Sequence, residues 1–209
     1  MSVVMGTSSR RAVWSLFVGL LAAGISLGRL WLGNRDSLRE NLWAEDGLFP
    51  LCIHKADFLT CLGDPFAGYF LFLPRVLAWP ISLLPVESWA LGANLVASVL
   101  AGIVAACAFL IMARAGLGAY VSVAVALLSV VTPMVGLEAI NAIGSSYMLL
   151  LFLATLALLF RPVSNWTRVD VALVGVLLVV TSLTIPSALV LVLILVLILG
   201  LPSSPSFSF

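Results

Sequence analysis

Long apolar stretches separated by charged residues are the main feature of the sequence. The first covers 12–32 and tolerates Arg29, whose charged head can reach the membrane interface while its stem stays in apolar surroundings. Three more uncharged intervals follow at Ser88–Ala113, Ala115–Leu137 and Ala139–Phe160. Because about 20 apolar residues cross the roughly 30 Å hydrocarbon core of a bilayer, each of these four stretches predicts one spanning helix.

The last apolar interval, Val171–Leu201, is too long for one straight crossing. As a single helix it would extend about 46 Å, at about 1.5 Å per residue. Pro186 lacks an amide hydrogen and crowds the preceding turn, so we expect a break at 184–187 between halves at 169–184 and 187–201. Both halves are short for a full crossing, and one strongly tilted helix is the alternative. The chain therefore predicts five or six transmembrane helices.

A proline-rich apolar stretch, Pro65–Val86, differs from these intervals. It contains four prolines and one charge, at Pro65, Pro74, Pro80, Pro85 and Arg75. In lipid these residues would leave backbone groups without hydrogen-bond partners, so the stretch does not suit a spanning helix. We expect one or two short helices at the outer membrane surface instead.

The proline-rich stretch belongs to a larger segment, 33–87, which predicts one extracytoplasmic loop. The loop carries seven of the nine acidic residues, namely Asp36, Glu40, Glu45, Asp46, Asp57, Asp64 and Glu87. The predicted fold is an all-α polytopic integral membrane protein with a single transmembrane domain over 1–209. Its parts are a first helix at 12–32, the loop at 33–87 and the remaining helices at 88–201.

Composition and charge exclude two broad classes. Hydrophobic residues make up 63% of the 209 residues and charged residues only 9%, whereas a soluble domain has about 25% charged residues. The formal net charge is +1, and no basic run is long enough to neutralise several phosphates. We therefore exclude a soluble globular domain and a nucleic-acid-binding protein, and the bilayer is the expected environment.

Five arginines near the ends of the predicted helices set the expected orientation. They are Arg10, Arg11, Arg114, Arg161 and Arg168, and all lie on one side if the N-terminus is cytoplasmic. The loop at 33–87 then faces outward. Two arginines before an apolar stretch resemble a secretory signal, but no A-x-A-like cleavage site follows. We expect a retained first helix and a multi-pass protein of the inner (plasma) membrane.

The strongest chemical signal is the acidic pair Glu45 and Asp46, within Trp43–Gly47 just beyond the first helix. Adjacent carboxylates raise each other's proton affinity and attract a cation, which suits a general base with a hydrogen-bonding or metal-binding helper. A solvated loop with an Asp-Gly turn explains the same residues. Their position against the membrane favours a site where a lipid-linked substrate presents its phosphate-linked sugar.

Three motifs together carry a family resemblance. They are Trp43–Gly47, Pro65–Tyr69 with Pro74 and Arg75, and Gly136–Asn141. The chain resembles bacterial multi-spanning membrane proteins of the C-type glycosyltransferase superfamily, whose usual donor is a polyprenyl-phosphate sugar. The resemblance covers nearly the whole chain, and its specificity rests mainly on the first motif. Members of that superfamily are usually longer, so we expect this chain to correspond to the N-terminal part of one.

The resemblance implies transfer of a sugar from a polyprenyl phosphate to an acceptor hydroxyl, with inversion, on the extracytoplasmic side. It maps the catalytic acids onto Asp46 as the base and Glu45 as a helper, or as a ligand of a possible divalent cation. A leaving phosphate requires cationic groups nearby, for which Arg75 and Lys55 are the candidates. The alternative for Arg75 is an interfacial anchor, and a solvated charge is the favoured interpretation of Lys55.

Glu138 is a second notable acid, at the outward end of a predicted helix, with Asn141 one turn later. Ionisable groups at membrane depth are functional candidates by default. We therefore expect Glu138 and Asn141 to line the cavity of the acidic pair and to contact substrate. An exposed loop acid is the alternative.

The positions of the cysteines and of the histidine say less about the function. Cys52 and Cys61 lie in the predicted outward loop, where an oxidising compartment permits a disulfide, although spacing alone does not fix the geometry. Cys107 is expected inside a helix. His54 is the single histidine of the chain, and a polar position on a short helix is favoured over a metal ligand.

Two other functional classes compete with an enzyme. A transporter would place ionisable side chains within facing helices near the membrane midplane, and the predicted helices carry few charges. A non-catalytic membrane scaffold would pack its helices through small residues, for which Gly24 and Gly28 in the first helix offer a surface.

Overall fold

The fold is helical throughout the part of the chain that the computed structural model describes. The described residues are 8–33, 42, 46–65, 70–131, 142–144, 146–160, 168–184, 189, 190 and 193. Within these ranges all regular secondary structure is helical, and no strand occurs. The predicted all-α class is confirmed for this part of the chain.

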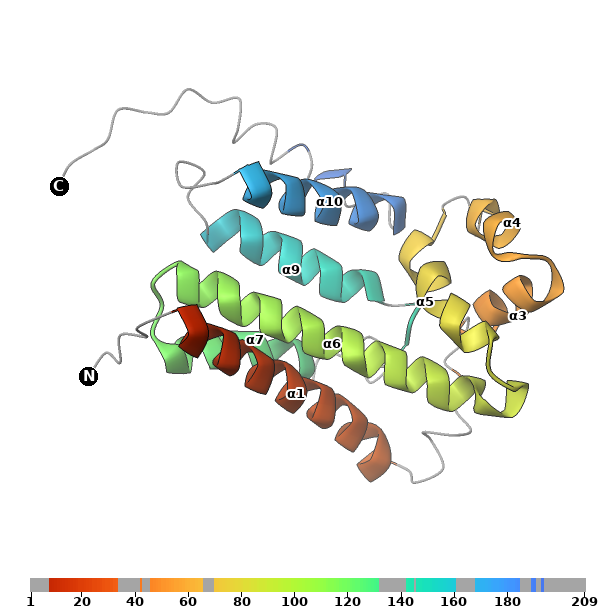
Figure 1. Ribbon diagram of the computed structural model, residues 1–209, viewed down its shortest axis with the longest axis horizontal. Helices are drawn as coiled ribbons and strands as arrows, with labels where there is room; N and C mark the ends of the chain where they lie inside the picture. Colours follow the sequence, from red (N-terminus) through yellow and green to blue (C-terminus); the bar gives the residue numbers. More distant parts are fainter. Residues whose placement is uncertain are drawn as a thin grey trace.

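In the described residues the longer helices run side by side, and short helices gather at one end of them (Figure 1). The longer helices form what we call the bundle: α1 (Ser8–Gly33), α6 (Trp89–Arg114), α7 (Ala119–Val131), α9 (Ser146–Phe160) and α10 (Arg168–Thr184). The short helices are α3 (Leu48–Lys55), α4 (Phe58–Gly63) and α5 (Phe72–Ser82), followed by the 3₁₀ turn η1 (Val86–Ser88). We call residues 46–65 and 70–88 the cap.

Two helices are long and apolar enough to cross a membrane, at Ser9–Leu32 and at Val86–Arg114. In the described residues α7 has 13 residues, α9 has 15 and α10 has 17. At about 1.5 Å per residue even α10 is only about 26 Å long. That length is below the roughly 30 Å of a hydrocarbon core. The described chain therefore has two candidate spans, and five or six remain a prediction.

A glycine turn shortens the apolar interval predicted at Ala115–Leu137. Gly116 adopts a left-handed backbone with φ of 85°. Its N–H donates to the Ala113 carbonyl (3.4 Å), and the Leu117 N–H donates to the Met112 carbonyl (3.2 Å). This pattern is a Schellman motif, which ends α6 and lets α7 start at Ala119. The interval therefore begins four residues before α7, because charge alone set its limits, and the spanning helix expected within it stays a prediction.

The interval predicted at Ala139–Phe160 is shortened in the same way. Residues 142–144 lie outside regular helix, and α9 begins at Ser146. Gly144 and the following serines are turn and helix-start residues, which disfavour a continuous helix. This non-helical segment matters below, because it contacts the cap.

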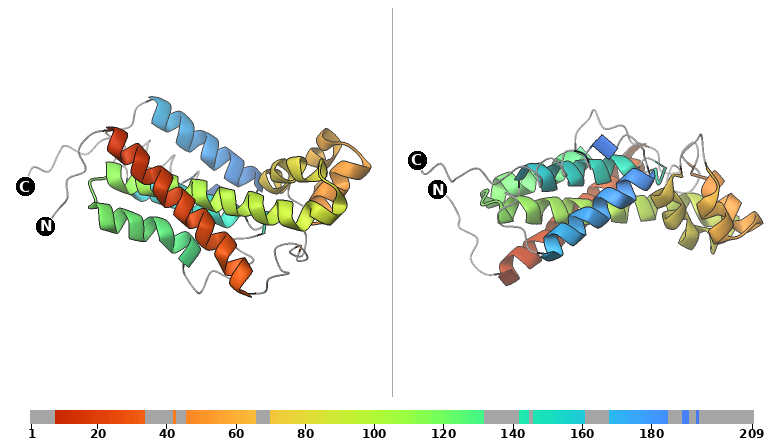
Figure 2. Two further views of the ribbon diagram at one scale, coloured as in Figure 1. Left: turned by 60° about the horizontal axis from the view of Figure 1, so that its bottom comes forward. Right: turned by 90° about the horizontal axis from the view of Figure 1, so that it is seen from above.

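The helices α1 and α6 approach each other closely where they cross, and Figure 2 shows this crossing from two further directions. A Cβ on Gly102 would lie 2.7 Å from the Gly19 carbonyl oxygen, and one on Gly19 would lie 2.9 Å from the Gly102 carbonyl oxygen. By contrast, a Cβ on Gly24 or Gly28 would meet nothing within 4 Å. Within the described chain the close packing of α1 against α6 therefore lies at Gly19, and a packing surface at Gly24 and Gly28 stays a prediction.

Two polar contacts also join the bundle helices. The hydroxyls of Ser26 in α1 and Ser98 in α6 lie 2.9 Å apart, and both side chains are buried. Arg29 donates from Nη1 to the Val130 carbonyl at the end of α7 (2.7 Å). The guanidinium thereby satisfies a carbonyl near the helix C-terminus, where positive charge is favourable. The charged head of Arg29 therefore binds the protein backbone. Its expected position at the membrane interface stays a prediction.

The cap has its own small core and a covalent link. Phe49 of α3, Ala78 and Ile81 of α5 and Trp89 at the start of α6 pack together with Ile143. Cys52 and Cys61 form a disulfide between α3 and α4, with a Cα–Cα distance of 5.9 Å. The disulfide that the sequence permitted is thus present, and it fixes two helices too short to be stable alone.

The helix α5 lies in the proline-rich stretch and contains 11 residues. It would extend only about 16 Å, too short to span a membrane. Its N-terminal end contacts the bundle, since the Leu73 N–H donates to the Thr184 hydroxyl (3.2 Å). Thr184 is the last residue of α10, where the interruption at 184–187 was predicted, and 185–188 lie outside the described residues. A location of α5 at the membrane surface remains a prediction.

Candidate functional site

Asp46 is the predicted acid that the structure places most firmly. It lies in the turn before α3 and is only 1% exposed. The Ile143 N–H donates to its Oδ2 and the Gly144 N–H donates to its Oδ1, both at 2.8 Å. Each carboxylate oxygen thus accepts a hydrogen bond from a backbone N–H group, and the two N–H groups belong to a segment about 97 residues further along the chain. Asp46 therefore joins the cap to the connection between α7 and α9.

Gly144 makes this approach possible. A Cβ at position 144 would lie 3.0 Å from Asp46 Oδ1 and 3.7 Å from a ring carbon of Phe49. The carboxylate cannot retreat, because both of its oxygens are already bonded. We infer that glycine is needed here for close backbone approach rather than for an unusual dihedral angle.

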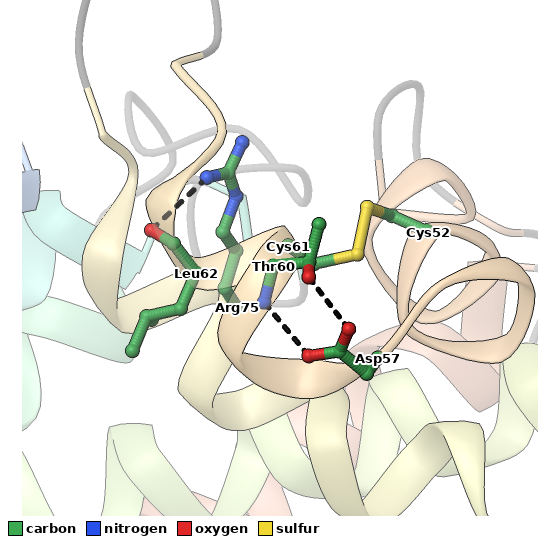
Figure 3. Close-up of a disulfide and its surroundings, with 6 residues drawn as sticks. All are labelled: Cys52, Asp57, Thr60, Cys61, Leu62 and Arg75. Atoms are coloured by element: carbon green, nitrogen blue, oxygen red, sulfur yellow. Dashed lines mark hydrogen bonds between the residues drawn. A yellow bond between two sulfur atoms is a disulfide. The ribbon is translucent and has the colours of Figure 1, made fainter.

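Arg75 is the predicted cation that lies deepest, with a 5% exposed side chain on α5. Its Nη1 donates to the Leu62 carbonyl in the last turn of α4 (3.3 Å), as Figure 3 shows. Burial lowers the pKa of Arg75, and the nearby charge of Asp64 opposes that shift. Arg75 remains charged, since an arginine pKa lies far above neutral pH. It thus holds a positive charge inside the cap.

The backbone that leads into Arg75 is strained. Leu71, four residues earlier, has a positive φ of 45° and is 3% exposed. A left-handed conformation costs a bulky residue about 1–2 kcal/mol, so the surrounding core must hold it in place. Leu71 packs in the cap core, and its carbonyl accepts from the Arg75 N–H (3.4 Å). This buried leucine therefore fixes where α5 starts, and with it the position of Arg75 in the first turns of the helix.

Three contacts hold α4 (Figure 3). The disulfide connects Cys61 to α3, and Arg75 binds the C-terminal end through Leu62. At the N-terminal end Asp57 accepts from the Thr60 N–H (2.8 Å) and the Thr60 hydroxyl. The hydroxyl bond and then the backbone bond lower the pKa of Asp57 below its usual value. Asp57 is thus an N-cap, a role the sequence analysis did not assign.

The other predicted site residues are not brought together by the described structure. Glu45, Glu138 and Asn141 lie outside the described residues, although Asn141 directly precedes the segment that Asp46 binds. Lys55 ends α3 and is exposed, which agrees with a solvated charge. His54 is exposed and lies in a T-shaped arrangement with Trp89, with ring centroids 6.1 Å apart.

The possible divalent cation has limited support from the described side chains. No group of three or more His, Cys, Asp or Glu residues lies together among them. Each oxygen of Asp46 already accepts from a backbone N–H group, so the carboxylate has fewer lone pairs left to offer a cation. A metal at the acidic pair would have to draw on residues beyond those the structure describes.

Comparison with known proteins adds no name to this arrangement, because no family model, no curated protein and no solved structure matches the chain. The site therefore has to be interpreted from its own chemistry. That chemistry consists of a buried carboxylate bound to two backbone amides and a buried guanidinium in a disulfide-linked cap.

Proposed function

We propose that the chain, alone or as the N-terminal part of a longer protein, transfers a sugar from a polyprenyl phosphate to an acceptor hydroxyl. The observation that carries the proposal is the joint burial of Asp46 and Arg75 in one cap at the end of an apolar bundle. Departure of a phosphate from a sugar needs a fixed cation, and deprotonation of the acceptor needs a carboxylate, for which the acidic pair of Glu45 and Asp46 offers two candidates. A lipid-linked donor brings its phosphate-linked sugar to the membrane surface, where such a cap would lie.

Arg75 suits the role of a phosphate clamp. A guanidinium has five N–H donors, and the hydrogen bond to Leu62 uses one of them. A planar guanidinium can bind two phosphate oxygens at once, which orients the leaving group. Its burial lowers the local dielectric and strengthens the attraction to a phosphate.

The membrane arrangement belongs to the same proposal. Five or six spans, a cytoplasmic N-terminus and an inner-membrane location place the cap on the extracytoplasmic side. The Cys52–Cys61 disulfide supports that side, since disulfides persist in oxidising compartments. The cap then meets a donor lipid at the outer surface of the bilayer, with Glu138 and Asn141 from the neighbouring connection as further substrate contacts.

The test is sugar transfer in membranes that carry each variant, with radiolabelled polyprenyl-phosphate sugars as donors. We expect Glu45→Gln and Asp46→Asn to lower turnover by about 10²–10⁴-fold. Arg75→Ala should raise the donor KM more than it lowers kcat, because a phosphate clamp acts in ground and transition states alike. Glu87→Gln, an exposed cap residue, serves as the charge control. Treatment with a chelator measures any need for a divalent cation.

A non-catalytic membrane scaffold is the second candidate. It is favoured by the close α1–α6 crossing at Gly19 and Gly102, and by the use of Arg75 to bind the end of α4. Under this alternative all of the variants above assemble and behave as the parent protein does, and no labelled sugar is transferred. Full activity in Asp46→Asn would contradict any role of Asp46 in transfer.

A further inference from the structure

The two members of the acidic pair have different tasks. We infer that Asp46 is a positioning residue whose carboxylate fastens the connection between α7 and α9 to the cap. The proton-accepting task then falls to Glu45, and this second half of the inference rests on the proposed function. The first half concerns the folded protein alone.

The geometry around Asp46 is that of a clamp. Two consecutive backbone N–H groups, of Ile143 and Gly144, donate to its two oxygens at equal distances of 2.8 Å. Hydrogen bonds to an ionised carboxylate are about twice as strong as neutral ones. At 1% exposure water does not compete with them. Without the Asp46 carboxylate, these two buried or partly buried amides would lack this hydrogen-bond acceptor. Proteins avoid burying amides without an acceptor.

Neighbouring residues are fitted to the same contact. Ile143 is fully buried and packs in the cap core with Phe49. The segment is therefore held both by this side chain and by its two backbone amides. A side chain at Gly144 would reach Asp46 Oδ1 at 3.0 Å, where the donor–acceptor pair leaves no room. The acid, the glycine and the isoleucine thus form one docking contact between distant parts of the chain.

Proton transfer to Asp46 would oppose this arrangement. A protonated carboxyl group has an O–H donor in place of one acceptor position. Protonation would remove the negative charge that strengthens both amide hydrogen bonds, and it would convert one oxygen into an O–H group, which is a poorer acceptor for the N–H facing it at 2.8 Å. A group that gains and loses a proton in every turnover would weaken the clamp in every turnover. Asp46 is therefore suited to hold the site, and not to act as its base.

Hydrogen exchange of the Ile143 and Gly144 amides tests the clamp directly, with the whole chain in detergent micelles or nanodiscs. In Asp46→Asn an amide NH₂ replaces one oxygen and faces an N–H donor. We expect exchange at one or both amides to accelerate by about 10-fold or more and the Tm to fall by about 5–10 °C. Glu87→Gln should leave both unchanged. Unchanged exchange in Asp46→Asn would overturn the inference.

Gly144→Ala provides a second route if Asp46→Asn does not fold. It keeps both acids and crowds the clamp, because the new Cβ would lie 3.0 Å from Asp46 Oδ1 and one of the two must shift by a few tenths of an ångström. We expect faster exchange at the Ile143 amide and lower sugar transfer in this variant, despite the intact acidic pair. Normal exchange together with normal transfer would contradict the clamp.

The pH dependence of kcat separates positioning from base catalysis. If Asp46 positions the site, Asp46→Asn retains the acidic limb of the profile at reduced amplitude, and Glu45→Gln loses that limb. The opposite pattern would make Asp46 the base and overturn the assignment. If the parent protein transfers no sugar while the exchange effect is present, the proposed function fails and the clamp stands.

Discussion

The bundle and the cap are held together by different physics. In the bundle, helices approach closely at small residues, as at Gly19 and Gly102, and polar contacts such as that between Ser26 and Ser98 join them as well. In the cap, short helices are fixed by a disulfide, a buried arginine, an N-cap and the carboxylate clamp. Because the short helices are too brief to be stable alone, specific bonds add to the packing of the small cap core. The candidate site lies in this bonded region of the chain.

The largest effect is expected at the α1–α6 crossing. In Gly102→Val the new Cβ would lie 2.7 Å from a backbone oxygen of Gly19, so the helices must separate. We expect a loss of about 3 kcal/mol or more in the free energy of unfolding. Gly24→Val is the matched control, because position 24 faces open space. Thermal unfolding of the two variants in the same detergent measures the difference. Equal stabilities of Gly102→Val and Gly24→Val would contradict the close contact between α1 and α6 at Gly102.

Removal of the disulfide should loosen the cap and spare the bundle. The link closes a loop with a sequence separation of nine residues, and the chain-entropy relation gives about 2–3 kcal/mol for a loop of that size. In Cys52→Ser with Cys61→Ser we expect faster proteolysis within 56–63. Cys107→Ala controls for loss of a thiol elsewhere. Cleavage that instead begins in α6 would show that the two regions are not separate in stability.

The paired serines between α1 and α6 should contribute less. Ser26→Ala leaves the Ser98 hydroxyl buried without its interhelical partner, so we expect a loss of about 0.6 kcal/mol, the average for such bonds between membrane helices. The double variant with Ser98→Ala should be no less stable than the single one, because both polar groups are then gone. A double-mutant cycle on unfolding measures the coupling. Strictly additive losses would mean that the hydroxyls do not interact.

The bundle was easier to predict than the cap, and the reason is physical. Apolar intervals between charges located α1 and α6 to within a few residues, because long uniform helices follow from hydrophobicity alone. The same approach missed the turn at Gly116 and the non-helical segment at 142–144, where backbone geometry decides. The signal for both was glycine.

The candidate site was predicted in its residues but not in its contacts. Asp46 and Arg75 were chosen from residue type and position, and both are buried in the cap. Their partners are backbone groups at Ile143, Gly144 and Leu62, which have no signature in sequence. Contacts between main chain and side chain 97 residues apart depend on the packing of the whole chain. The left-handed Leu71 could not be foreseen either, since leucine rarely adopts that conformation.

The smallest expected effect is a pH dependence local to α4. The hydrogen bonds from Thr60 lower the pKa of Asp57, so folding is favoured by the ionised carboxylate. A lowered pKa means that this stabilisation is fully present above the ordinary value near 4 and is lost as pH falls through the lower, folded-state pKa. We expect the protection factor of the Thr60 amide to be constant from about pH 7 to pH 5 and to fall below about pH 4. Asp57→Asn, whose side chain cannot titrate, should have low protection of the Thr60 amide at all of these pH values. Protection of the Thr60 amide that is as high in Asp57→Asn as in the parent protein, or that does not fall with pH in the parent protein, would contradict the role of the ionised Asp57 carboxylate as the N-cap of α4.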